Sequence, residues 1–206
     1  MRAFYESVWA DLPDDPEPWA WGRRRDVLLG AVAPGERVLD LGCGAGRFVA
    51  ALRDAGAEPI GVELAEAALE RAGRNVPGAD LRLVGEDRAL PLGHGEVDVV
   101  WCSEVLEHVP DTAALLSEAR RVLRTGGRLL VTTPSHDLPR RALIAVARFD
   151  EHFDPQGQHV RFYSRRSLRR VLGEFAFEDV HVSHIGGLPR LRETLVARAR
   201  KARLLL

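Results

Sequence analysis

Three side chains that can bind protons or metal ions stand close together near the middle of the sequence. Glu104, Glu107 and His108 are spaced by three and four residues, so in a helix they would share one face. An imidazole there could take a proton from a substrate hydroxyl, and two carboxylates with an imidazole could hold a divalent cation that acidifies a bound oxygen. The same residues could instead cap a helix or meet solvent. These three interpretations remain open at this point.

An apolar stretch that runs into alternating glycines is the clearest binding signal. Gly42, Gly44 and Gly46 follow Asp40 at every second position. Glycines let the backbone turn sharply and approach a ligand, because no Cβ stands in the way. At the carboxyl end of a parallel strand, such a turn is where α/β sheets bind nucleotide-like ligands. A dinucleotide-binding motif would place its third glycine where this sequence has Arg47, which disfavours a nucleotide-dependent oxidoreductase.

An acidic residue stands about twenty residues beyond that turn, at the spacing of a ribose-binding acid. Glu63 ends the predicted strand Pro59–Glu63, where its carboxylate could accept hydrogen bonds from ribose hydroxyls. A lone acid at this place is more typical of a helix cap. In combination with the glycine turn, it indicates a cofactor that carries a nucleoside.

The elements that would position these residues alternate between strands and helices, which indicates a parallel α/β sheet with right-handed crossovers. We expect strands at Arg37–Leu41, Pro59–Glu63, Asp80–Val84, Val97–Cys102, Arg128–Thr133 and Phe177–Ser183. Apolar spacing predicts helices over Trp21–Val32, from Asp111 to a stop at Gly126–Gly127, and after Ser164. The basic stretch from Leu188 predicts an amphipathic helix at the carboxyl end.

Composition sets further limits on the class of protein. The 206 residues, of which 46% are hydrophobic and 29% charged, fit one domain with residues 1–34, 35–134 and 135–206 as its parts. A formal net charge of −1 argues against nucleic acid as a partner. The absence of a long apolar run argues against membrane insertion, and the early charges against a signal peptide, so we expect a cytoplasmic monomer or homodimer. Cys43 and Cys102 are expected to be buried thiols.

The first 34 residues are rich in aromatic side chains around a proline-rich break. This segment could form a lid over the cofactor that excludes water, or it could simply pack an amphipathic helix on the sheet. The aromatic residues concerned are Phe4, Tyr5, Trp9, Trp19 and Trp21.

Four segments in order resemble the motifs of the class I S-adenosylmethionine (SAM)-dependent methyltransferases. They are Asp40–Gly46, Gly85–Leu92, Val97–Asp111 and Leu123–Leu130, and the resemblance covers roughly residues 20–185. Within this family, the chain resembles the type 11 methyltransferases and the ubiquinone-biosynthesis O-methyltransferases. The resemblance implies a Rossmann-like, doubly wound, mostly parallel seven-stranded sheet with an antiparallel last strand.

The resemblance also implies roles for residues of the cofactor site. Glu86, or Asp87 beside it, would accept the adenine amine, and Ser103 would contact the methionine portion. Arg24 or Arg25 would pair with the cofactor carboxylate. The full set of cofactor-binding residues that we predict is Arg25, Asp40, Gly42, Cys43, Gly44, Gly46, Glu63, Leu64, Glu86, Asp87 and Ser103.

On the acceptor side, the resemblance implies a site for a metal ion and a second histidine in the acceptor pocket. The ubiquinone-type enzymes share the Glu-x-x-Glu-His pattern of Glu104, Glu107 and His108, which implies a divalent cation such as Mg²⁺ at these residues. His159 falls in Gln158–Ser164, in the region that usually builds the acceptor pocket, where it could equally order a loop. His108 and His159 are therefore our candidates for catalysis.

The reaction implied is methyl transfer from SAM to a small-molecule acceptor, with S-adenosyl-L-homocysteine as product. A phenolic, quinone-like or secondary-metabolite hydroxyl is the expected acceptor. N-methylation of a small molecule, and a noncatalytic SAM-binding protein, remain as alternatives. In-line displacement at an activated methyl group requires mainly positioning, so the catalytic residues are harder to name than those of the cofactor site.

Overall fold

The computed structural model describes the greater part of the chain. The described ranges are residues 2–13, 16–85, 89–147, 149–154, 157–186 and 193–203. The predicted adenine-binding acids Glu86 and Asp87 lie outside these residues.

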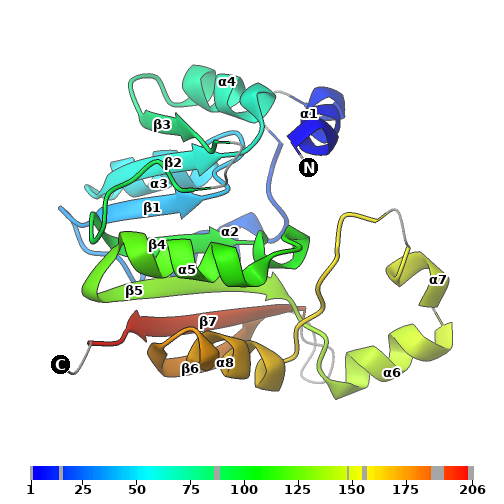
Figure 1. Ribbon diagram of the computed structural model, residues 1–206. Helices are drawn as coiled ribbons and strands as arrows, with labels where there is room; N and C mark the ends of the chain where they lie inside the picture. Colours follow the sequence, from blue (N-terminus) through cyan, green and yellow to red (C-terminus); the bar gives the residue numbers. More distant parts are fainter. Residues whose placement is uncertain are drawn as a thin grey trace.

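A seven-stranded sheet forms the middle layer, with its strands in the order β3-β2-β1-β4-β5-β7-β6 (Figure 1). Strands β1 to β5 are parallel, and β7 is antiparallel to both β5 and β6. This confirms the mostly parallel sheet that the sequence and the resemblance predicted. The strands are β1 Arg37–Leu41, β2 Glu58–Glu63, β3 Asp80–Leu83, β4 Val97–Ser103, β5 Leu123–Pro134, β6 Phe177–Ile185 and β7 Thr194–Lys201.

Helices cover both faces of the sheet, while α6 and α7 project beyond one end of it (Figure 1). Apolar side chains of β1 pack toward both faces: Leu39 and Leu41 join one core, and Val38 joins another with Trp101 and Leu52. Burial on both sides explains why the central strands read as continuous apolar runs. The helices are α1 Arg2–Asp11, α2 Trp21–Leu29, α3 Arg47–Asp54, α4 Glu66–Asn75, η1 Leu106–His108, α5 Thr112–Val122, α6 Leu138–Ala147, α7 Phe149–His152 and α8 Arg165–Glu174.

Two predicted helix starts are confirmed by their caps. The Asp111 carboxylate accepts the N–H of Ala114 at 2.9 Å, and Ser164 begins α8 with a capping box. The predicted stop of α5 was too late, because the helix ends at Val122 and the pair Gly126–Gly127 lies within β5.

The predicted basic helix at the carboxyl end was wrong over Thr194–Lys201, which forms β7. Its burial alternates near the end of the strand, with Ala197 and Ala199 buried and Arg198 exposed. Hydrogen bonding to β5 on one side and β6 on the other outweighs the weak helical spacing of the same apolar residues. The antiparallel strand implied by the resemblance is therefore this segment.

The chain around Glu104 also departs from the expected helix. Glu104 has a φ of 54°, and a single 3₁₀ turn, Leu106–His108, follows it. The spacing of Glu104, Glu107 and His108 therefore does not place them on one helix face. Both cysteines are buried free thiols, as expected. Within the described residues, every helix is too short or too polar to cross a bilayer.

Candidate functional site

The glycine turn connects the end of β1 to the start of α3 and approaches its neighbours closely. Gly42 has a φ of 78° and Gly44 a φ of 52°, both in the left-handed region that favours glycine. A Cβ on Gly42 would lie 2.5 Å from Val105 Cγ2, and one on Gly44 would lie 2.9 Å from the ring of Trp9. Gly42 and Gly44 therefore have no room for a side chain, and Gly42 lines the cavity beside the turn with its backbone.

Glu63 ties the end of β2 to this turn. Its carboxylate accepts the N–H of Gly44 at 3.1 Å, of Leu64 at 2.6 Å and of Ala65 at 3.3 Å. Burial raises the pKa of Glu63, and these three hydrogen bonds oppose the rise. The predicted ribose-binding acid thus lies directly beside the glycine turn.

An inner cavity of about 260 Å³ opens between the turn and the loops after β2 and β4. Gly42, Glu63 and Leu64 line one side, and Val105 and Leu115 line another. Apart from Glu63 and a few other polar groups, the walls are mainly apolar, as is typical of small-molecule sites.

Helix α1 covers this cavity with Tyr5 and Trp9. The helix is held in place by Glu6, whose carboxylate accepts the N–H of Glu66 at 2.6 Å and of Ala67 at 3.1 Å at the start of α4. Tyr5 and Trp9 thus line the inner cavity, and their role as a lid remains a prediction. Trp21, by contrast, packs into the core against Phe48, with ring centroids 4.8 Å apart.

The remaining residues of the predicted cofactor set are close to the turn but differ in what they offer. The Cys43 thiol is buried, and its backbone N–H donates to Val62 O at 3.0 Å. Gly46 is the residue before α3. Asp40 is buried in β1, and its Oδ2 has no hydrogen-bond partner in the described part of the chain. Burial and the Glu63 charge raise the pKa of Asp40 to about 8.

Arg24, rather than Arg25, faces the site from α2. The Arg24 side chain is 4% exposed, and its Nη1 donates to Ser103 Oγ at 2.9 Å. Arg25 is 44% exposed and pairs with Asp26 at 3.0 Å. Successive helix positions point about 100° apart, so only one of the adjacent arginines can be directed at the sheet. The predicted choice of Arg25 thus does not match this arrangement.

A chain of buried and half-buried polar groups runs across the ends of β4 and β5. Ser103 Oγ lies 2.8 Å from Thr132 Oγ1, which donates to Glu104 Oε1 at 2.9 Å. Thr133 Oγ1 donates to Glu107 Oε2 at 3.0 Å. Burial raises the pKa of both carboxyls, and the neighbouring Glu104 charge raises that of Glu107 further. The pair therefore holds a proton more tightly than isolated carboxylates do.

The two candidate histidines lie next to each other. The ring centroids of His108 and His159 are 4.8 Å apart, and His108 Nδ1 lies 3.1 Å from the Gln158 carbonyl oxygen. A carbonyl only accepts, so Nδ1 carries the proton in the neutral ring and Nε2 keeps its lone pair. Burial, with the neighbouring His159, lowers the pKa of His108 to about 4. His108 is therefore a neutral base near pH 7.

The potential metal ligands are grouped differently from the prediction. Ligand atoms of Glu107, His108 and His159 all lie within 4.8 Å of one another, whereas Glu104 is not in this group. Glu104 Oε1 lies 3.9 Å from Arg24 Nη1 and accepts from Thr132 Oγ1, while the Glu104 side chain is also hydrogen-bonded to that of Glu107. The shared face expected for Glu104, Glu107 and His108 required a helix, and the backbone forms a single 3₁₀ turn there instead.

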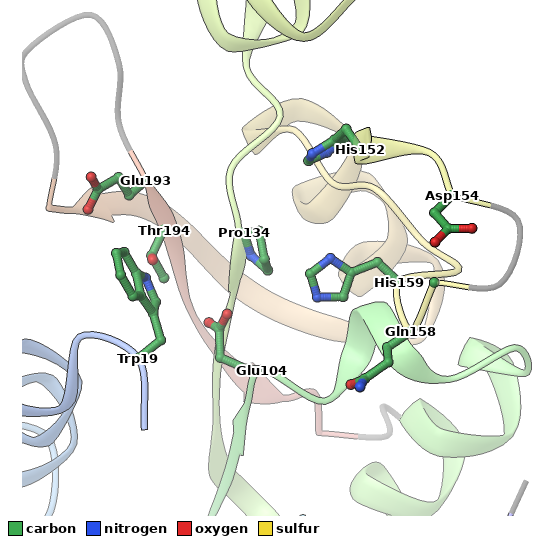
Figure 2. A pocket seen from close by; sticks show the side chains of 10 residues that line it. Trp19, Glu104, Pro134, His152, Asp154, Gln158, His159, Glu193 and Thr194 are labelled. Atoms are coloured by element: carbon green, nitrogen blue, oxygen red, sulfur yellow. The ribbon is translucent and has the colours of Figure 1, made fainter. Parts of the chain in front are cut away.

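An outer cavity of about 510 Å³ lies on the other side of Glu104 (Figure 2). Trp19 and Glu193 stand on one side of it in Figure 2, and His152 and His159 on the other. Glu104 lines both this cavity and the inner one. The two cavities therefore meet at the end of β4.

Sequence reasoning missed most of the outer cavity. Trp19, Pro134 and Glu193 come from three separate segments without a recognisable motif. His152 also lines this cavity, and its Nε2 lies 2.7 Å from Nε2 of the buried His136. The concentration of histidine and aromatic residues after Pro134 was the one available signal, and it could not show which of them meet.

Comparison with known proteins places this architecture among methyltransferases. The model of a family described as Methyltransferase domain matches residues 16–182. The structure is also similar to that of a phosphoethanolamine N-methyltransferase 2 of Haemonchus contortus, solved in complex with S-adenosyl-L-methionine. The TM-score is 0.72 at 17% identity, over 97% of this chain and 56% of that one. That likeness shows the fold alone.

Curated relatives agree with the family match. The chain is 33% identical over 161 residues to the ubiquinone biosynthesis O-methyltransferase of Idiomarina loihiensis. This alignment covers 72% of this chain and 64% of that protein. The chain is 37% identical over 186 residues to a Mycolicibacterium smegmatis protein named "Probable S-adenosylmethionine-dependent methyltransferase", over 87% of this chain and 69% of that protein. The chain thus spans less than two thirds of the Idiomarina enzyme. It belongs to the class I SAM-dependent methyltransferase family.

Proposed function

We propose that this protein transfers the methyl group of SAM to a small-molecule acceptor, and that the acceptor atom is a hydroxyl oxygen. The observation that carries the proposal is the meeting of two cavities at Glu104. One cavity is lined by the glycine turn and the predicted ribose-binding acid Glu63, and the other is lined by His152 and His159. A donor in the first and an acceptor in the second would come face to face.

The residues around the inner cavity fit the parts of SAM. The Cβ-free turn at Gly42 leaves the backbone accessible, and the Glu63 carboxylate is placed to meet a ribose. The buried Arg24 guanidinium, which lies beside Ser103, would pair with the amino-acid carboxylate. SAM supplies a methyl group already activated by its positive sulfur. The chain's own task is then to align and to exclude water.

His108 is the residue that we assign to proton removal. Its Nδ1 donates to the Gln158 carbonyl, which leaves Nε2 free to accept the proton of a substrate hydroxyl. Its lowered pKa keeps the ring neutral, although it also makes the ring a weaker base. His159, which lines the outer cavity next to His108, would position the acceptor.

The donor set does not suit the Mg²⁺ that the resemblance implied. Glu107, His108 and His159 offer two imidazoles and one carboxylate, whereas Mg²⁺ prefers an octahedral shell of oxygen ligands. Glu107 Oε2 is also bonded to Thr133. We therefore derive no step through a metal and assign the proton transfer to the imidazole.

A hydroxyl acceptor is favoured over an amine by two observations. A neutral histidine beside the junction is useful where the acceptor must lose a proton during attack. The relative from Idiomarina loihiensis is itself named an O-methyltransferase. The outer cavity, of about 510 Å³, has the size of a small-molecule site.

The test measures SAM binding by calorimetry and transfer of labelled methyl groups to a panel of phenols, catechols and amines. We expect Glu63→Gln to weaken SAM binding about tenfold or more, because an amide offers one acceptor oxygen where the carboxylate accepts three N–H groups. Glu58→Gln, at the exposed start of the same strand, is the matched control. SAM binding without methyl transfer to any acceptor would favour a noncatalytic SAM-binding protein.

A further inference from the structure

A cavity rich in basic residues lies at the edge of the sheet opposite the glycine turn. Strand β5 begins at this edge with Leu123 and reaches the acceptor side at Pro134, while the antiparallel β7 ends here at Lys201 (Figure 1). The cavity measures about 590 Å³. The lining residues that matter here are His94, Ser117, Arg120, Thr125, Lys201 and Arg203.

No carboxylate lines this cavity among the described residues. Arg121, which also lines it, is neutralised by Glu118, with an Nε to Oε1 distance of 2.7 Å. Arg120, Lys201 and Arg203 form no ion pair within the described ranges. Three positive charges therefore converge on one cavity without a counter-charge on its walls.

Hydrogen-bond donors remain available on these groups. The Nε of Arg120 is buried, and no acceptor within the described ranges bonds to it. Lys201 Nζ donates to the Leu123 carbonyl at 2.6 Å, and an ammonium group has two further donors. The exposed hydroxyls of Ser117 and Thr125 lie on the same walls. The cavity thus combines a guanidinium, an ammonium and neutral hydroxyl donors.

The cations destabilise one another as they stand. Burial and the charge of Arg120 lower the pKa of Lys201, so its charged form is less favourable here than in water. A bound anion would offset both effects. Basic side chains are also favourable near the carboxyl end of a helix, where they can bond to its last carbonyl groups. At the end of α5, that interaction accounts for a single hydrogen bond, from Lys201 to the Leu123 carbonyl.

We infer that this cavity binds a phosphate group, either as free phosphate or as part of a phosphomonoester. A compact dianion matches the convergence of Arg120, Lys201 and Arg203, and phosphate oxygens accept from guanidinium, ammonium and hydroxyl donors together. A single carboxylate would leave much of the positive charge unbalanced.

The site is separate from the proposed methyl-transfer site but shares a helix with it. Ala114 and Leu115 near the start of α5 line the inner cavity, whereas Ser117 and Arg120 line the basic one. The inference does not depend on the proposed function. Loss of phosphate binding and loss of SAM binding can be measured independently on the same protein.

The experiment is a titration of the full chain with inorganic phosphate at constant ionic strength, in which ³¹P NMR and calorimetry measure binding. We expect saturable binding that Arg120→Gln and Lys201→Gln each weaken about tenfold, since each removes a charge-assisted hydrogen bond. Arg169→Gln, at an exposed position on α8, is the matched control and should not change it. Unchanged SAM binding in each variant shows that the chain is folded.

A second titration with glycerol 3-phosphate separates the two sources of the anion. Tighter binding than that of free phosphate assigns the site to a phosphomonoester, and weaker binding assigns it to phosphate itself. Phosphate affinity that is the same in the wild type, Arg120→Gln and Lys201→Gln would overturn the inference. The absence of saturable binding in the wild-type protein would overturn it as well.

Discussion

The inner and outer cavities meet at one residue but are built in different ways. The inner cavity depends on backbone: the glycine turn, the N–H groups bonded to Glu63 and the ends of neighbouring parallel strands. The outer cavity depends on side chains from scattered segments, among them Trp19, His159 and Glu193. Under the proposed function, donor binding would be fixed by the fold itself, whereas acceptor choice could change with a few side chains.

Substitutions should therefore separate into two groups. Changes around the glycine turn should alter the affinity for SAM, and changes at the junction of the cavities should alter turnover at nearly constant affinity. A variant that alters both quantities equally would contradict this separation.

The largest effect is expected for His108→Asn. Removing the proposed base should lower kcat for a hydroxyl acceptor by about a thousandfold, the usual range for general acid–base catalysis. SAM affinity should stay within about threefold, because the ring contributes only one part of the inner wall. Steady-state kinetics and calorimetry measure the two quantities, with His181→Asn, an exposed position in β6, as the control. Full activity of His108→Asn would exclude it as the base.

The next effect concerns the turn itself. Gly42→Ala should weaken SAM binding by about a hundredfold, because the new Cβ would lie 2.5 Å from Val105 Cγ2 in addition to the strain of a φ of 78°. Gly78→Ala meets the same kind of strain, with a φ of 75°, but has open space around it. Its SAM affinity should equal that of the wild type. Equal losses in both variants would show that backbone strain alone, and not the close approach, is responsible.

The third test compares adjacent arginines. Arg24→Gln should weaken SAM binding about thirtyfold, since it removes a buried guanidinium that lies beside Ser103. Arg25→Gln should change it less than twofold, because that side chain is exposed and paired with Asp26. Calorimetric titration with SAM distinguishes the two. A larger loss of SAM affinity in Arg25→Gln than in Arg24→Gln would support Arg25 as the partner of the cofactor carboxylate.

A fourth effect appears in stability. Asp40 in the folded protein has a pKa of about 8, raised above that of an unfolded aspartate by burial. Its contribution to stability is therefore complete below about pH 4 and is lost as the pH rises toward 8. Between pH 6 and 8, the unfolding free energy should fall by about 2 kcal/mol more in the wild type than in Asp40→Asn. Urea unfolding at both pH values measures this, with the exposed Asp26→Asn as control.

If the unfolding free energies of the wild type and Asp40→Asn change with pH in parallel, Asp40 is ionised in the folded protein. Its unpartnered Oδ2 would then require a counter-charge, for which Arg24 is the nearest candidate. Other buried acids, such as Glu107, add to the pH dependence of both proteins equally, so the comparison cancels their contribution.

Much of the inner region was predictable from sequence because its determinants are local. The order of strands and helices follows from apolar periodicity, and the glycine spacing marks the turn directly. The choice between Arg24 and Arg25 was not predictable, because it depends on the rotation of α2 against the sheet. Strand β7 was missed for a similar reason, since pairing with β5 and β6 on both sides decides its conformation.

For the outer cavity, the sequence showed only that the segment after Pro134 is rich in histidine. The positive φ of Glu104 rotates its side chain away from the helical arrangement assumed for Glu104, Glu107 and His108. His159 then joins Glu107 and His108 from more than fifty residues further along the chain, a contact that no local pattern encodes. Side chains brought together by loops, rather than by strand ends, are the part that sequence periodicity does not reach.

The smallest effect is expected from removing metal ions. If proton transfer depends on His108 alone, dialysis against EDTA should leave kcat within about twofold, since neither the neutral imidazole nor its bond to the Gln158 carbonyl requires a cation. Kinetics before and after dialysis, with added Mg²⁺ and Zn²⁺ in separate samples, measure this. Loss of activity that Zn²⁺ restores and Mg²⁺ does not would assign a metal to Glu107, His108 and His159, because two imidazoles and one carboxylate favour a transition metal. Restoration by Mg²⁺ would instead require Glu104 to give up its contacts with Arg24 and Thr132. The boundary between the fixed inner cavity and the adaptable outer one would then lie at Glu104 itself.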